Sequence, residues 1–171
     1  MYSQDYKDPQ NVKLIEERLS ERILILDGAM GTMIQGFELV ESDFRGARFE
    51  DHALSLRGNN DLLTLTQPDI IAGIHRNFLN AGADLVETNT FNSTSISQAD
   101  YGMEHLVYEL NFAAAKLARQ ETDRFNHKST DKPRFVVGTL GPTNRTATLS
   151  PDVNRQDFRN IRFEDLRVSY K

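Results

Sequence analysis

Two acidic residues stand at the ends of two apolar runs, and their positions make them the first candidates for chemistry. Asp27 follows the run Ile-Leu-Ile-Leu at 23–26, and Glu87 closes a second run at 83–86. A carboxylate at the end of a buried strand costs free energy unless a cation or a hydrogen-bond donor faces it. Two such carboxylates therefore favour a cationic group, such as a substrate ammonium, or a metal ion. The alternatives are that Asp27 caps the following turn and that Glu87 pairs with an arginine.

Short polar side chains and glycines surround the two acids. Thr88, Asn89, Thr90 and Asn92 follow Glu87 and suit a small polar substrate, although the same residue types also form turns. A dinucleotide site is disfavoured, because the glycines after Asp27 lack the G-x-G-x-x-G spacing and the acid would repel a phosphate.

The composition excludes several other classes of site. The chain of 171 residues has no cysteine, which excludes disulfides, thiolate nucleophiles and cysteine-bound zinc, and its four histidines are scattered. The 20 basic and 25 acidic residues give a net charge of −5, which disfavours nucleic-acid binding. We find neither a membrane-spanning run nor a secretory signal at the N-terminus, and expect a cytoplasmic protein.

Hydrophobic spacing predicts alternating strands and helices. We expect a loose polar tail at 1–10, then helices at 11–20, 68–82, 104–120 and 164–171, with strands at 23–26, 83–88 and 134–139. The helix at 11–20 is expected to plug one end of the domain. Continuous apolar character predicts that the strand at 23–26 is buried on both faces. The long connection at 33–66 contains a possible short strand or packed loop at 62–65, and Thr66 is a candidate cap for the helix that Pro68 begins.

This alternation predicts an α/β fold with a parallel sheet and outer helices. Two architectures remain open, a doubly wound sheet or part of a (β/α)₈ barrel, and three strands cannot close a barrel of ~250 residues. In both architectures ligands bind beyond the carboxyl ends of the strands. The segments 27–32, 87–92 and 138–143 should therefore lie at one edge of the sheet.

Several motifs together resemble one known family. They are Ile-Leu-Asp-Gly-Ala-Met-Gly-Thr (25–32), Asn-Asn-Asp-Leu-Leu (59–63), Ala-Gly-Ala-Asp-Leu-Val-Glu-Thr-Asn-Thr-Phe-Asn-Ser-Thr (81–94), Asn-Phe-Ala-Ala-Ala-Lys-Leu-Ala-Arg (111–119) and Gly-Pro-Thr-Asn-Arg-Thr (141–146). In this order they resemble the homocysteine-binding module of cobalamin-dependent methionine synthases, in the homocysteine S-methyltransferase family. Betaine-dependent homocysteine methyltransferases share a looser version of the first two motifs.

The resemblance implies that residues 11–171 form the first three parallel strands and outer helices of a TIM-type (β/α)₈ barrel. It also implies that a zinc ion held by three cysteines activates the homocysteine thiol, which takes a methyl group from methylcobalamin to give methionine. The cobalamin and folate modules of a longer parent chain would be the partners. Eight residues are implied to bind substrate. Asp27 would hold the amino group, backbone N–H groups of Gly28, Ala29, Met30 and Gly31 the carboxylate, and Glu87, Thr88 and Asn89 would line the same pocket.

The sequence departs from this pattern in one respect. The zinc cysteines of the family lie after later strands, so we expect them beyond the C-terminal end, and we expect this chain alone to bind neither zinc nor cobalamin and to be inactive. We also expect self-association through open strand edges. Two rival functions stay open, a non-catalytic half-barrel scaffold or interaction protein, and a different barrel enzyme that uses Asp27 and Glu87 for acid–base chemistry.

Overall fold

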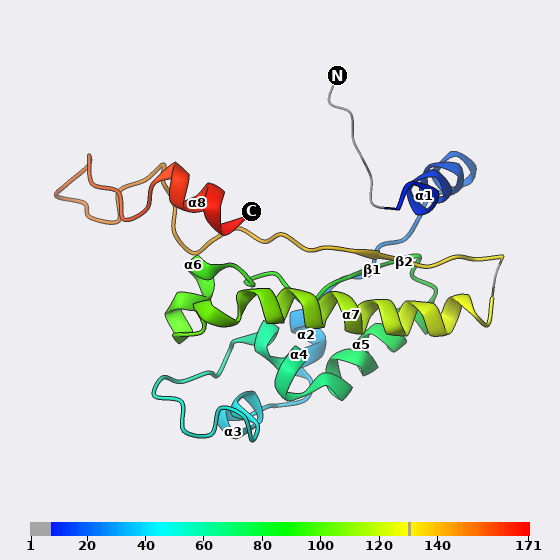
Figure 1. Cartoon of the computed structure of the whole chain (residues 1–171), viewed down its shortest axis with the longest axis horizontal. Coiled ribbons are helices and arrows are strands. Elements are labelled where there is room, and N and C mark those ends of the chain that lie inside the picture. The colour runs from blue at the N-terminus through cyan, green and yellow to red at the C-terminus, as the bar shows by residue number, and fades with distance from the viewer. Residues whose placement is uncertain (1–7, 130) are drawn as a thin grey trace.

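The computed structural model describes residues 8–129 and 131–171, which form an α/β structure with a small parallel sheet (Figure 1). Strand β1 (Leu85–Glu87) pairs with strand β2 (Phe135–Val137) in parallel, with Val86 opposite Val136. Leu26 adds one parallel bridge to Leu85 on the other side of β1. The three predicted strand segments therefore run parallel and lie side by side in chain order. This is the neighbour order of a barrel, although barrel closure itself stays a prediction.

The segment 23–26 differs from its predicted burial. Ile23 is 83% exposed and Ile25 is 56% exposed, and only Leu26 makes a strand bridge. The expectation that this run is buried on both faces is wrong for the chain as described. A continuous apolar run is buried only where elements pack on both of its faces, and these side chains remain open to solvent.

Two long helices pack on one side of the sheet and form the core with it (Figure 1). Helix α5 (Pro68–Ala81) starts at a proline and is capped at its C-terminal end by Gly82, whose φ of 107° suits glycine. Gln67 occupies its N-cap position, so the predicted cap by Thr66 is wrong. Helix α7 (Val107–Asn126), preceded by η3 (Glu104–Leu106), extends beyond the predicted end at 120. The fully buried side chains of Ile74 and Leu110 belong to this core.

The long connection at 33–66 contains several short helices. They are the second half of α2 (Met30–Gln35), then α3 (Glu41–Arg45), η1 (Asn60–Leu62) and α4 (Leu63–Thr66). The possible strand at 62–65 is therefore wrong. Its four consecutive positions Leu-Leu-Thr-Leu lack a distinctive period, and burial of Leu62 and Leu63 against the helices decides their conformation.

One ion pair organises the irregular part of this connection. Glu41 accepts hydrogen bonds from the backbone N–H groups of Leu56 and Arg57, both at 2.8 Å, and from Arg45 Nε at 2.8 Å. Arg45 in turn donates to the carbonyl oxygens of His52, at 2.6 Å, and Leu54, at 3.0 Å. These contacts fix the loop that leads into η1, and η1 reaches the site described below.

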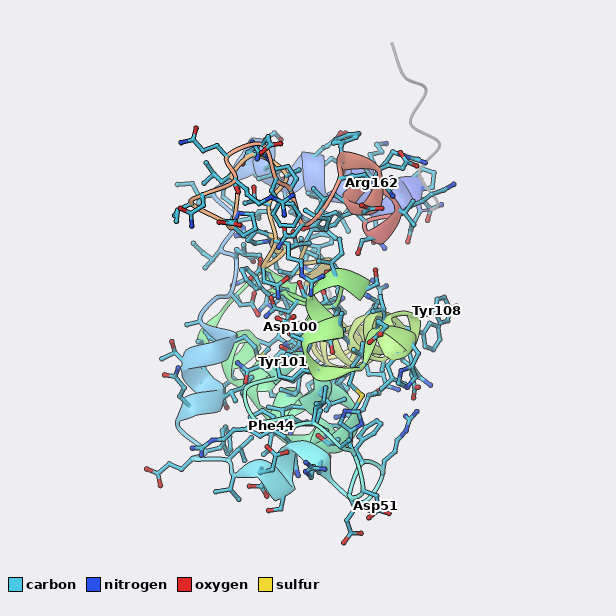
Figure 2. All side chains as sticks on the ribbon, turned by 90° about the vertical axis from the view of Figure 1, so that its left-hand side faces the viewer. Phe44, Asp51, Asp100, Tyr101, Tyr108 and Arg162 are labelled. Carbon is cyan, nitrogen blue, oxygen red and sulfur yellow. The ribbon has the colours of Figure 1, made fainter. Side chains whose placement is uncertain are left out.

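The terminal segments pack less closely. Asp8 caps α1 (Pro9–Glu21), so residues 9–10 are helical rather than part of a loose tail, and residues 1–7 of that predicted tail lie outside the described chain. Helix α1 contains no buried residue, which contradicts the expected plug. The short elements α6 (Ser95–Gln98) and η2 (Ala99–Tyr101) precede α7, and the C-terminal helix α8 (Phe163–Ser169), which follows Arg162 (Figure 2), contacts α6, where the Ser95 and Ser169 hydroxyl groups lie 2.8 Å apart. No helix in the described ranges is both long and apolar enough to cross a membrane.

Candidate functional site

A cavity of about 340 Å³ lies where β1 and β2 end at their carboxyl edge. Its wall is built by the turn after residue 26, by η1, by the loop that follows β1, and by Thr139 after β2. All eight residues singled out from the sequence line it, namely Asp27, Gly28, Ala29, Met30, Gly31, Glu87, Thr88 and Asn89. The structure thus brings them together, and their part in binding a substrate stays a prediction.

The backbone of β1 holds the Asp27 side chain in place. Asp27 N–H donates to the Leu85 carbonyl at 2.9 Å, and Asp27 Oδ1 accepts the Glu87 N–H at 2.9 Å. The carboxylate therefore spans the ends of two neighbouring strands. It does not cap the following helix, because α2 has Ala29 at its N-cap position and no side-chain cap.

The electrostatic environment of Asp27 favours its neutral form. The pKa of Asp27 is raised to about 6, mainly by burial; the hydrogen bond from the Glu87 N–H lowers it, and the negative charge of Glu87 contributes to the rise. A cation placed beside Asp27 would stabilise the ionised form. The site therefore gains most from a ligand with a positively charged group.

The turn between Asp27 and α2 has an unusual backbone conformation. Ala29 has a φ of 49°, in the left-handed region that side chains disfavour, and it directly precedes Met30 at the start of α2. The first amides of a helix have no partner within the helix. These amides border the same cavity as Asp27. Their N–H groups can donate to a carboxylate and Asp27 can accept from an ammonium group, so one wall carries partners for both charges of a small zwitterion.

Hydroxyl and amide side chains fix the loop after β1. Thr88 Oγ1 accepts the Thr139 N–H at 3.0 Å, and the Thr90 hydroxyl donates to the Thr139 carbonyl at 2.8 Å. Asn89 Nδ2 donates to the Asn60 carbonyl at 2.8 Å and to Thr64 Oγ1 at 3.2 Å. The loop is therefore tied to the exit of β2 on one side and to η1 on the other.

Six further residues line the wall, of which Thr90 and Asn92 were noted in the sequence as suited to a small polar substrate and the others were not singled out: Asn60, Asp61, Thr90, Phe91, Asn92 and Thr139. Asp61 is the main omission, because it is a carboxyl group with only 2% of its surface exposed. Burial raises the pKa of Asp61 to about 6. The motif Asn-Asn-Asp at 59–61 was the available signal, but its residue types also punctuate turns.

The charge of the wall is negative. Its carboxyl groups are Asp27, Asp61 and Glu87, and no lysine, arginine or histidine of the described ranges lines the cavity. Glu87 forms no ion pair within 4.0 Å in the described part of the chain, so the predicted alternative of an arginine partner finds no support. A phosphate would be repelled by this wall, whereas an ammonium group would be attracted. Within the same described residues, no group of three or more His, Cys, Asp or Glu side chains is arranged to hold a metal ion.

Comparisons with known proteins agree with the resemblance seen in the sequence. The family model for homocysteine S-methyltransferase matches residues 24–171. The chain is similar to the metallated form of the homocysteine methyltransferase MmuM from Escherichia coli, with a TM-score of 0.57 and 21% identity over 74% of this chain. The oxidized form of MmuM gives a TM-score of 0.56 and 23% identity over 72%. These matches cover 40% and 39% of MmuM, so the chain spans well under half the length of the solved structures it resembles, and the likeness concerns the fold.

Proposed function

The chain belongs to the homocysteine S-methyltransferase family, and on that premise we propose that it is the homocysteine-binding part of a cobalamin-dependent methionine synthase. The observation that carries the proposal is the meeting of the eight predicted residues around one acidic cavity at the carboxyl ends of parallel strands. The stretches Glu-Thr-Asn-Thr-Phe-Asn (87–92) and Pro-Thr-Asn-Arg-Thr (142–146) favour the cobalamin-dependent enzyme over the betaine-dependent one.

The proposed role of the chain's own residues is to bind and orient the amino-acid part of homocysteine. The ionised Asp27 attracts the ammonium group, and amides at the start of α2 face the carboxylate. Glu87, Thr88 and Asn89 border the remaining space, in which the thiol-bearing side chain would lie. Fixing the amino-acid end of the substrate orients its sulfur for reaction with a methyl donor, which is a contribution of positioning.

The residues present do not fit the zinc ion that the resemblance implies. Three cysteines are required, the chain has none, and the described residues form no substitute cluster. Likewise, nothing in the described residues identifies a site for cobalamin, which the resemblance assigns to a separate module. We therefore propose that this chain by itself binds homocysteine without transferring a methyl group.

Isothermal titration calorimetry tests the binding part of this proposal, and a methyl-transfer assay with methylcobalamin tests the inactivity. Homocysteine is expected to bind with one-to-one stoichiometry and no methionine is expected to form. Methionine production at a steady rate would contradict the proposed inactivity. Failure of homocysteine to bind would contradict the proposed function of the cavity in this chain.

Homocysteine affinity should depend on pH. The pKa of Asp27 is about 6, so Asp27 becomes protonated below that pH and loses its attraction for the ammonium group, which stays charged. Affinity should therefore fall at least roughly tenfold between pH 7 and pH 5, since Asp27 must be deprotonated for tight binding and Asp61 in the same wall, with a pKa of about 6, is protonated over the same range. Calorimetry across this range measures the effect.

Asp27→Asn should weaken binding at pH 7 and reduce the pH dependence, whereas Asp51→Asn, at an exposed loop position (Figure 2), should leave both unchanged. Equal affinities of the unmodified chain at pH 5 and pH 7 would contradict this assignment.

A non-catalytic scaffold is the second candidate, and the exposed apolar segment 23–26 favours it. Strand edges and apolar side chains left open to solvent promote association, so we propose that two copies of the chain pair through this surface. Light scattering at increasing concentration should give masses above the 19.5 kDa of one chain. Ile23→Lys places a charge at the most exposed position of the segment and should shift the mass towards the monomer. A monomer at all concentrations would rule out the pairing.

A further inference from the structure

Asp61 is a buried carboxyl group whose hydrogen bonds use one of its two oxygens. Asp61 Oδ2 accepts the Asn92 N–H at 2.6 Å and the Ser93 hydroxyl at 2.9 Å. Within residues 8–129 and 131–171, Oδ1 accepts no hydrogen bond, and Asp61 lines the cavity. One oxygen therefore anchors the loop after β1, while the other is free for a group that enters the cavity.

The anchoring of the loop does not require a negative charge. An asparagine of the same shape could accept both hydrogen bonds through its carbonyl oxygen without the cost of burying an ion. In the described part of the chain no lysine, arginine or histidine forms an ion pair with Asp61. The pKa of Tyr101 is raised mainly by burial, and the charges of Asp100 and Asp61 add to the rise, so its phenol is neutral and does not compensate the buried anion of Asp61. The carboxylate therefore lacks a counter-ion within the chain.

Asp27 has the same arrangement on another part of the wall. Its Oδ1 accepts the Glu87 N–H, and its Oδ2 accepts no hydrogen bond from the described residues. Asp27 and Asp61 are each held by a backbone N–H through one oxygen, and both border the same cavity. An ammonium group has three N–H donors, which allows it to contact more than one carboxylate.

Resting on the proposed function, we propose that Asp61 supplies a second negative contact for the ammonium group of the bound amino acid, through its free Oδ1. The inference assigns a binding role to a residue of η1, an element that the sequence-predicted site did not include. It also defines the ligand class more narrowly. The cavity should select amino acids over analogues that keep the carboxylate and the thiol but lack the amino group, because such analogues leave the buried Asp61 and the half-buried Asp27 without a cation.

Two probes and one substitution test this role. L-Homocysteine and 4-mercaptobutanoate differ in the amino group, and their dissociation constants are measured by calorimetry at pH 7 on the full chain and on Asp61→Asn. Asparagine keeps the shape and can accept both hydrogen bonds. Homocysteine binding is expected to weaken by roughly tenfold or more, as for a lost hydrogen bond between charged groups. Binding of 4-mercaptobutanoate should stay the same or tighten, so the discrimination between the probes should shrink about tenfold.

Ser93→Ala is the matched control, because it removes one hydrogen bond to the same carboxylate and keeps the charge. It should preserve the discrimination between the two probes. Asp27→Asn provides an independent measurement should Asp61→Asn not fold. If Asp61 contributes, Asp27→Asn retains part of the preference for homocysteine over 4-mercaptobutanoate. If Asp27 acts alone, that preference disappears in Asp27→Asn and the proposal is overturned.

The possible failures can be told apart. If homocysteine binds the unmodified chain and Asp61→Asn equally well, the role of Asp61 is overturned while the proposed function stands. Equal weakening of both probes by Asp61→Asn assigns Asp61 to loop anchoring alone and also overturns the contact. If the unmodified chain binds neither homocysteine nor 4-mercaptobutanoate, the proposed function fails, and the role of Asp61 fails with it.

Discussion

Replacing Asp84 with asparagine is expected to lower the free energy of unfolding by about 3 kcal/mol, the upper end of the range for hydrogen bonds to a charged group. Asp84 is 1% exposed and directly precedes β1. Its carboxylate accepts two hydrogen bonds from Arg22, at 2.7 and 2.8 Å, and one from the Ile25 N–H at 2.9 Å. Asp84 thus joins the segment 22–26 to β1, and its loss also removes a counter-charge from Arg134, whose nitrogen lies 3.9 Å away.

Urea unfolding of both proteins at several pH values measures this effect. The hydrogen bonds from Arg22 are the main cause that lowers the pKa of Asp84 to about 2. Since the folded-state pKa is below the unfolded value of about 3.8, the contribution is present above pH 4 and is lost as the pH falls towards 2. The difference between the two proteins should shrink over that window. Asp123→Asn is the control, because its ion pair with Arg119 is solvent-exposed and should contribute less than about 1 kcal/mol. A similar small effect at Asp84 would contradict the anchoring role.

Replacing Gly141 with alanine is expected to destabilise the chain by about 3 kcal/mol, the upper part of the usual range for overpacking. A Cβ atom at this position would lie 2.8 Å from Phe91 Cγ and closer still to the Phe91 carbonyl oxygen. The Phe91 backbone has little freedom to move, because Asn89 and Asn92 on either side of it are hydrogen-bonded to η1. The segment 139–142 must therefore shift away from the cavity wall.

Thermal unfolding and homocysteine titration of Gly141→Ala measure the two consequences, a lower melting temperature and weaker binding. Weaker binding follows because Thr139, which lines the cavity, would move with the segment. Gly138→Ala is a control three residues earlier, since no atom lies within 4 Å of a Cβ placed there. It should change the free energy of unfolding by no more than about 0.5 kcal/mol. Equal effects of the two substitutions would show that the contact with Phe91 is not the cause.

The family and the grouping of the candidate residues around one cavity were predictable because their signals are local. Asp27 and Glu87 each follow an apolar run, which predicts that they lie at strand ends. In a parallel sheet the carboxyl ends of the strands meet at one edge, which predicts that the two acids lie near each other. A proline at residue 68 and a glycine at residue 82 likewise bound α5 within one continuous segment. The sequence thus predicted the parallel segments, their order and eight residues that line one cavity.

Contacts between distant residues decided the rest. Asp61 became part of the cavity through hydrogen bonds to residues 31 and 32 positions later, and a turn-like motif does not reveal such partners. The helical conformation at 62–65 followed from burial against other helices. The four residues show no hydrophobic periodicity from which that conformation could be predicted. The exposure of segment 23–26 depends on what packs over it, whereas its composition records only that it is apolar. Local patterns therefore determined the order of the elements, and tertiary packing determined which polar groups are buried and which cavity they face.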